Sequence, residues 1–179
     1  MITYTPADSD VLDRVARLMA AHHGMLVEYK VRVDCLFAHP DLDEDGVPKG
    51  PPVTLNGYPC AAKVKITSAK DRAKGCGDAE IIIDHDAYQE LADAERDALL
   101  DHELQHLESN GEYDDMGRPK LKMRLHDHSF GWFDIIVARH GRAALEFQQA
   151  ERFQRGTFQP FWVGFAEAVD TIMAEGISP

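Results

Sequence analysis

Hydrophobic and polar residues follow two different periods in the first third of the chain. Residues 9–24 carry apolar side chains three and four positions apart, which predicts an amphipathic helix that ends at Gly24. Residues 27–37 place apolar side chains at every second position, with polar residues between them up to Asp34, which predicts a long, half-buried strand. Residues 38–59 are rich in proline, glycine and acidic residues and predict an extended loop.

The middle of the chain predicts two more strands followed by helices. Residues 61–66 alternate and predict a strand, whereas the continuous apolar run in 79–84 predicts a strand buried on both faces. A helix is expected over 93–109, capped by Asp93 and stopped by Asn110-Gly111. Shorter elements are also expected, namely a helix or turn at 67–75, a short helix at 85–91 and a brief strand at 120–124 in a loop over 111–127.

The last third predicts mainly helix. Residues 128–140 place apolar side chains on one face and predict a helix that ends at Gly141. Residues 142–175 are expected to be mostly helical, with breaks near Gly156 and Pro160. The whole pattern predicts an α+β fold with a three- to four-stranded sheet.

Composition and charge exclude several classes of protein. The net charge of −12 disfavours binding to nucleic acid, and no apolar run is long enough to cross a bilayer. The N-terminus lacks the features of a secretory signal, so a cytoplasmic location is expected. Cys35, Cys60 and Cys76 lack metal-binding or redox spacing and are expected to be reduced thiols. Residues 41–46 resemble half a calcium loop, but Pro52 replaces the required glutamate, which favours a solvated acidic turn.

The most informative segment is ALLDHELQHLE, residues 98–108, which contains His102, Glu103 and His106 in an HExxH arrangement. Side chains four positions apart project from the same face of a helix, so the two imidazoles can converge on one ion. Glu103 lies beside the first imidazole, at an angle from which its carboxylate reaches a water in an open coordination position. The segment therefore predicts a zinc site with Glu103 as the general base. The competing interpretation is a pair of idle histidines on a solvated helix face.

A catalytic zinc ion takes three protein ligands and a water, so a third ligand is expected downstream. The candidates are His126 and His128 in LHDHSFGWF, with His140 further along. We favour His128, because it opens the predicted helix over 128–140, whereas His126 lies in a loop. The other histidine is expected near the ligands or on the surface. Asp127 is either an acceptor for a ligand imidazole or a solvated helix cap.

Three stretches together carry a resemblance to a known family. KVKITSAKDRAKGCGDAEIIID, LLDHELQHLE and HDHSFGWFDIIVARHG resemble the phage metallopeptidases, small predicted zincins of phages and prophages that are distantly similar to SprT-like proteases. The resemblance covers about residues 26–141. It implies His102, His106 and His128 as ligands of Zn²⁺ and Glu103 as the base. Because HDHS supplies two histidines, the resemblance allows the third ligand to be either of two histidines that lie two residues apart.

The resemblance also implies a domain organisation. A zincin-like metallopeptidase domain is expected over 1–141, built on the HExxH helix, the sheet and flanking helices. Residues 142–179 lie outside the resemblance and are expected to form a helical extension packed on the same domain. A phage protein of this kind would act in the cytoplasm of the bacterial host.

The expected activity is zinc-dependent hydrolysis of peptide bonds in a protein or peptide substrate. Tyr113, Arg124 and His126 are candidates for stabilising the oxyanion, and cobalt or manganese can occupy the same ligand set. The alternative is a closed site in which His126 and His128 both bind zinc, in a non-catalytic phage or prophage protein that sequesters a host target. A third hypothesis is a protease acting on protein–DNA crosslinks, which the acidic charge disfavours. The sequence does not indicate an oligomeric state.

Overall fold

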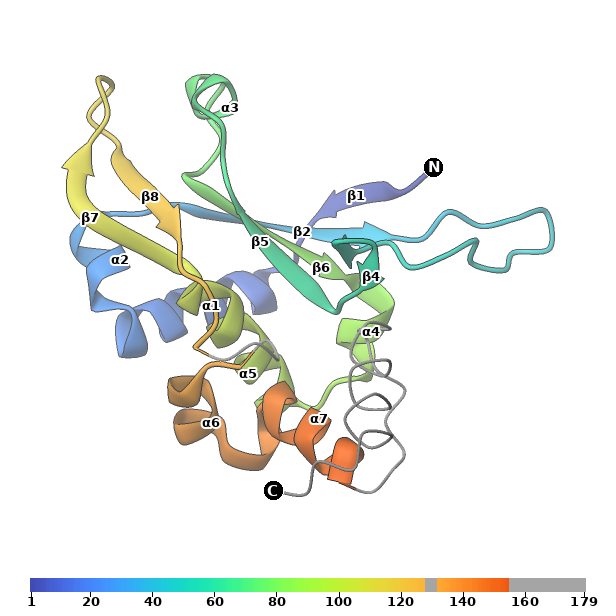
Figure 1. The fold of residues 1–179 in the computed structure, drawn as a ribbon. Helices are drawn as coiled ribbons and strands as arrows, with labels where there is room; N and C mark the ends of the chain where they lie inside the picture. Colours follow the sequence, from blue (N-terminus) through green and yellow to red (C-terminus); the bar gives the residue numbers. More distant parts are fainter. Residues whose placement is uncertain (128–131, 155–179) are drawn as a thin grey trace, which may run out of the picture.

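A computed structural model describes residues 1–127 and 132–154 of the 179-residue chain. The described residues form a mixed α+β fold, which confirms the predicted class (Figure 1). In chain order the elements are β1 (Thr3–Pro6), α1 (Ser9–His22), α2 (Gly24–Glu28), β2 (Val33–His39), β3 (Thr54–Leu55), β4 (Tyr58–Pro59), β5 (Ala62–Ile66), α3 (Ala69–Ala73), β6 (Ala79–Asp84), α4 (His85–Glu90), α5 (Asp93–Gln105), β7 (Leu107–Tyr113), β8 (Pro119–Met123), α6 (Asp134–His140), the 3₁₀ turn η1 (Gly141–Ala143) and α7 (Leu145–Gln154).

The main sheet has four strands in the order β1-β2-β6-β5. Its two central strands, β2 and β6, are parallel, and each outer strand is antiparallel to its neighbour. In Figure 1 the helices α1, α5, α6 and α7 lie below this sheet, while the separate β7–β8 hairpin rises beside it. Strand β5 therefore forms one edge of the sheet, on the side that contacts α5.

The core fills the space between the sheet and the helices. The run Ile81-Ile82-Ile83 in β6 is buried throughout, as predicted. Ile81 and Ile83 belong to the main cluster, whereas Ile82 packs on the opposite face with Ala38 and Val53. Helix α5 contributes Leu99, Leu100 and Leu104 to the main cluster, together with Val11, Val15 and Leu18 from α1. Buried apolar contacts thus hold α5 in place beneath the sheet.

The strand predicted over 27–37 is wrong in its first half. Residues Gly24–Glu28 form α2, in which Leu26 is buried and Val27 is half exposed, and β2 begins only at Val33. Lys30 has a φ of 54°, and the amide of Val31 donates to the carbonyl oxygen of Leu26. The segment with alternating apolar residues therefore contains a helical turn, a change of chain direction at Lys30 and the first part of strand β2. Strand β1 was not predicted, because all four of its residues are exposed.

The helix predicted over 93–109 ends four residues early. Helix α5 stops at Gln105, with His106 as its C-cap, and Leu107–Tyr113 forms β7. Leu107 and Ser109 are buried and pair with β8, so this segment gains cross-strand partners that a continued helix would lack. The N-cap is Ala92 rather than Asp93, and the Glu95 carboxylate accepts its amide hydrogen at 2.8 Å. The predicted loop over 111–127 is largely this hairpin, and β8 corresponds to the brief strand expected at 120–124.

The later helix begins at Asp134 instead of residue 128. Phe133 is an extended N-cap, and the amide of Asp134 donates to the carboxylate of Asp127 at 3.2 Å, which sets the helix start. Gly141, with a φ of 54°, ends the helix as predicted. Phe130 and the breaks expected near Gly156 and Pro160 lie outside the described residues.

The segment that resembles half a calcium loop is a tight acidic turn. The Asp43 carboxylate accepts the amides of Asp45 and Val47 at 3.0 and 2.8 Å. Asp41 forms ion pairs with Lys49 and the N-terminal amine. None of the helices in the described part of the chain has the length and apolar composition that a membrane span requires.

Candidate metal site

The HExxH residues lie at the C-terminal end of α5, where the helix meets β7. His102 and Glu103 lie within the helix, and His106 is its C-cap with helical backbone angles. Leu100 and Leu104, on the opposite side of the helix, are fully buried in the main core cluster. The packing of these leucines fixes the face from which the two imidazoles project.

A third imidazole joins this pair from the segment between β8 and α6. Each of His102, His106 and His126 offers one ring nitrogen that lies within 4.8 Å of the others. The Nε2 atoms of His102 and His126 are 3.2 Å apart, and the rings of His106 and His126 have centroids 4.5 Å apart. Among the described residues this is the only group of three or more histidine, cysteine or acidic side chains arranged to hold a metal ion.

The spacing of these nitrogens fits a metal ion. Two nitrogens bound at 2.0–2.1 Å to one tetrahedral zinc ion are about 3.3–3.4 Å apart. The Nε2 separation of 3.2 Å between His102 and His126 is close to this value. The donor set therefore suits a cation such as zinc, for which imidazole nitrogen is a common ligand.

Hydrogen bonds fix the orientation of two of the three rings. The Nδ1–H of His102 donates to Oε1 of Glu146 at 2.6 Å, and the Nδ1–H of His106 donates to the carbonyl oxygen of Arg124 at 2.8 Å. A carbonyl oxygen only accepts, so His106 carries its hydrogen on Nδ1 and keeps a lone pair on Nε2. Ligand histidines in proteins usually donate their second nitrogen to a carboxylate or carbonyl in this way.

Phe133 forms the base of the cluster. Its side chain is fully buried, and its ring centroid lies 5.1, 4.9 and 4.8 Å from those of His102, His106 and His126. An apolar ring beneath the histidines excludes water from that side and restricts their rotation. Phe133, which follows His126 by seven residues, thus helps to shape the site.

Burial and charge give the three imidazoles different proton affinities. Burial lowers the pKa of His106 to about 4, and burial together with the charge of His102 lowers the pKa of His126 to about 4. Burial also acts to lower the pKa of His102, but the hydrogen bond to Glu146 and the charge of Glu103 outweigh it and raise that pKa. His106 and His126 are therefore neutral at ordinary pH, which is the form that binds a metal.

Glu103 is buried next to this cluster, with 6% of its surface exposed. Burial raises the pKa of its carboxyl group, while the charge of His102 and a hydrogen bond from the backbone of Val64 act in the opposite direction. Val64 belongs to the edge strand β5. Glu103 thus lies between the histidines and the edge of the sheet.

The other residues suggested by the sequence occupy different places. Arg124 pairs with Asp127 at 2.8 Å, and its guanidinium carbon lies 5.5 Å from the centre of the Phe133 ring. Asp127 also caps α6 and so helps to position the segment that carries His126. Tyr113 lies at the far end of β7, half exposed, with its ring against Tyr29.

The two remaining histidine candidates are not part of the described cluster. His140 donates instead to the buried carboxylate of Asp101 at 2.7 Å. His128, which the sequence favoured as the third ligand, lies outside the described residues. The structure therefore brings His126 to the pair and leaves the placement of His128 a prediction.

Sequence reasoning did not identify Glu146. It comes from α7, which the sequence placed in the C-terminal extension, and only 3% of its surface is exposed. Its Oε2 atom is buried without a hydrogen-bond partner among the described residues. A glutamate on a helix normally faces solvent, so the only available signal was the apolar neighbourhood of ALEF, in which Glu146 stands.

Comparison with known proteins indicates the family of the chain. Residues 49–155, well over half of the chain, match a family model described as "Putative phage metallopeptidase". The chain belongs to this family. The match confirms the resemblance seen in the sequence, and its range includes the three clustered histidines, Glu103 and Glu146. No curated protein and no solved structure matches the chain. The name of the phage metallopeptidase family and the histidine cluster both indicate a metal-binding protein.

Proposed function

We propose that this chain is a zinc-dependent peptidase in which His102, His106 and His126 hold the metal and Glu103 is the general base. The observation that supports this most strongly is the convergence of three ring nitrogens within 4.8 Å, beside a buried carboxylate. Membership of the phage metallopeptidase family gives the expected substrate class, which is a protein or peptide.

The proposed chemistry needs few groups. A zinc ion bound by the three imidazoles would supply Lewis acidity and bring the pKa of a coordinated water to about 7. Glu103 would accept the proton of the attacking water and pass it to the departing amine. The Nδ1–H bonds of His102 and His106 would keep their Nε2 lone pairs directed at the metal.

The position of β5 supports an extended peptide substrate. This strand is the edge of the main sheet, and the backbone of its Val64 reaches Glu103. An extended peptide can add to such an edge through main-chain hydrogen bonds. That placement would bring a peptide carbonyl next to the general base, and the combination of sheet edge and adjacent helix is consistent with a zincin-like fold.

Removing the metal should abolish the activity reversibly. We expect the purified chain to carry zinc, to lose cleavage of a labelled unfolded protein after treatment with a chelator, and to regain it when zinc returns. Elemental analysis and fluorescence release measure the two quantities in parallel. Cleavage that persists in a zinc-free preparation would contradict the proposal, whereas zinc binding without cleavage of a diverse peptide mixture would favour the non-catalytic alternative.

Glu146 should act through His102 and not on the substrate. Replacing Glu146 with glutamine removes the charge that the Nδ1–H of His102 faces at 2.6 Å, and we expect zinc affinity to fall about 10–100-fold. Competition with a chromophoric chelator measures this affinity, and circular dichroism checks the fold. Glu151→Gln is the matched control, because Glu151 lies on the same helix and pairs with Arg142 instead. Equal zinc affinities in the two variants would rule out the positioning role.

A further inference from the structure

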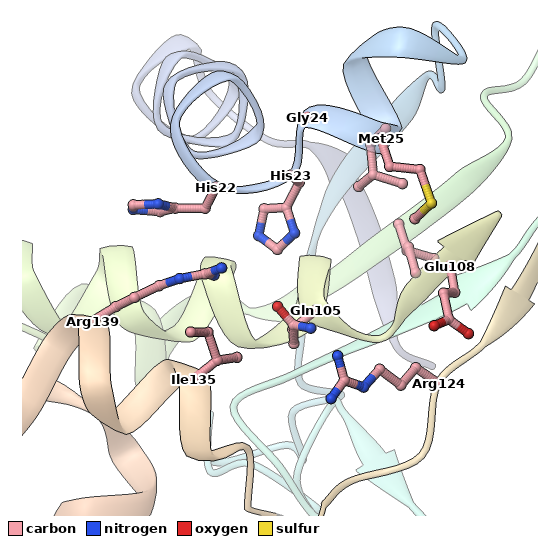
Figure 2. Close-up of a pocket in the computed structure, with 11 residues that line it drawn as sticks. His22, His23, Gly24, Met25, Gln105, Glu108, Arg124, Ile135 and Arg139 are labelled. Carbon is pink, nitrogen blue, oxygen red and sulfur yellow. The ribbon is translucent and has the colours of Figure 1, made fainter.

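A cavity of about 360 Å³ lies beside the histidine cluster, on the other flank of α5 from Glu103. It is bounded by the junction of α1 and α2, the end of α5, the start of β7 and helix α6 (Figure 2). Its walls are partly apolar, from residues such as Leu107 and Ile135. The proposed peptidase function does not use this cavity.

Two arginines and a glutamine meet in the cavity. Figure 2 shows Arg124 and Arg139 extending from opposite sides towards Gln105. Arg139 is held by its Nη1, which donates to both oxygens of Asp101 at 3.1 and 3.2 Å. Arg124 is held by its Nη2, which donates to Asp127 at 2.8 Å. Within the described residues, the remaining guanidinium nitrogens and the Gln105 amide have no hydrogen-bond acceptor.

The anchoring of Arg139 is unusually firm. Asp101 is fully buried and also accepts hydrogen bonds from His23 and His140, so three side chains converge on one carboxylate. A guanidinium fixed at one end presents its other donors without much loss of side-chain entropy. A preorganised pair of such forks suits a planar carboxylate, which accepts two parallel hydrogen bonds.

The carboxylates around the cavity all have partners. Among the described residues Glu108 alone lines the cavity with a carboxylate, and it pairs with Lys122 at 3.1 Å, while Asp101 and Asp127 each hold one arginine. The chain as a whole carries a net charge of −12, so its surface otherwise repels anions. The cavity therefore brings together two guanidinium groups, each held by one carboxylate, in an acidic protein.

The cavity adjoins the proposed metal ligands. Gln105 and Leu107 flank His106 in the chain, and the carbonyl of Arg124 accepts the Nδ1–H of His106. The Arg124 guanidinium also lies over Phe133, whose ring contacts all three histidines. A group bound in the cavity would thus lie against the backbone that positions the proposed metal ligand His106.

We propose that this cavity is a substrate subsite that binds a carboxylate through Arg124, Arg139 and Gln105. The proposal rests on the proposed peptidase function and adds a substrate class to it, namely peptides with an acidic side chain or a free C-terminus. The apolar wall would contact the methylene groups of a glutamate or the residue that precedes the terminal carboxylate.

Binding of short peptides to the zinc-loaded Glu103→Gln variant tests the subsite without cleavage. The probes are two pairs of alanine-based tetrapeptides. In the first pair both ends are blocked, and one internal residue is either glutamate or glutamine. In the second pair the sequence is all alanine, and the C-terminus is either free or amidated. We expect at least one carboxylate probe to bind about tenfold tighter than its neutral partner in an NMR titration. The pair that shows the preference identifies whether the carboxylate comes from a side chain or from the terminus.

A charge placed in the cavity provides the decisive comparison. Gln105→Glu removes no hydrogen bond found among the described residues and should abolish the preference, as should Arg124→Met. Gln89→Glu, an exposed substitution with the same charge change on α4, should leave the preference intact. Zinc content is measured for each variant so that a damaged metal site is recognised.

Two outcomes would overturn the subsite. One is equal binding of the carboxylate and neutral probes, and the other is a preference that survives Gln105→Glu unchanged. Either result leaves the peptidase proposal standing if zinc-dependent cleavage is observed. Conversely, a carboxylate preference that Gln105→Glu removes, in a chain without any cleavage, would support the binding site and refute the peptidase.

Discussion

Replacing Glu103 with glutamine is expected to reduce peptide cleavage by roughly 10²–10⁴-fold while zinc content and fold stay unchanged. Glutamine has the same shape and can still accept the backbone hydrogen bond from Val64, but it cannot take a proton from water. Because Glu103 is buried, a base on the protein surface does not readily take over its role. Cleavage rates of a labelled peptide, with elemental analysis of the same samples, measure the effect.

The matched control for this prediction is Glu112→Gln. Glu112 lies nine residues further along the chain, in β7, and pairs with Lys120 at the surface. We expect that variant to keep its activity. If Glu103→Gln cleaved as fast as the unmodified chain, Glu103 would not be the base, and a zinc-stabilised binding protein would explain the site better. That alternative requires Glu103→Gln to retain the biological function of the chain.

The sequence predicted those elements whose local pattern agrees with their tertiary surroundings. Strand β6, with its continuous isoleucines, and helix α1, with its regular apolar face, lie close to where they were expected. The failures occurred where tertiary contacts decide the outcome. Leu107 and Ser109 fit a longer helix by local propensity, but pairing with β8 draws them into a strand. Such cross-strand partners are distant in the sequence and leave no local periodicity.

The candidate site was accessible to sequence reasoning only in part. The pairing of His102 with His106 follows from helical spacing alone, because four residues make about one turn. The contact between His102 and Glu146 joins residues 44 positions apart and depends on how α7 packs, so the spacing of motif residues could not predict it. The choice between two histidines in HDHS likewise depends on the path of a loop. Local preference pointed to the start of a helix, whereas α6 begins only at Asp134.

Substitution of His126 should weaken zinc binding far more than substitution of His128. In His126→Ala the site loses a nitrogen that lies 3.2 Å from that of His102, and we expect the affinity to fall by more than about 100-fold, since outer hydrogen-bond partners alone contribute 10–100-fold. His128→Ala, only two residues away, is the matched control and should retain zinc. Competition titrations with a chromophoric chelator give both affinities.

Two other outcomes of the zinc titrations would change the assignment of the ligands. They matter because a zinc ion needs a coordination position free of protein ligands to bind a reactive water. If His128→Ala lost zinc and His126→Ala kept it, the ligand would be the one favoured by the sequence, and the proposed assignment would fall. If both variants lost zinc, four imidazoles would close the coordination sphere and leave no position for water, as in structural zinc sites. The peptidase proposal requires that one of these two histidines be dispensable for metal binding.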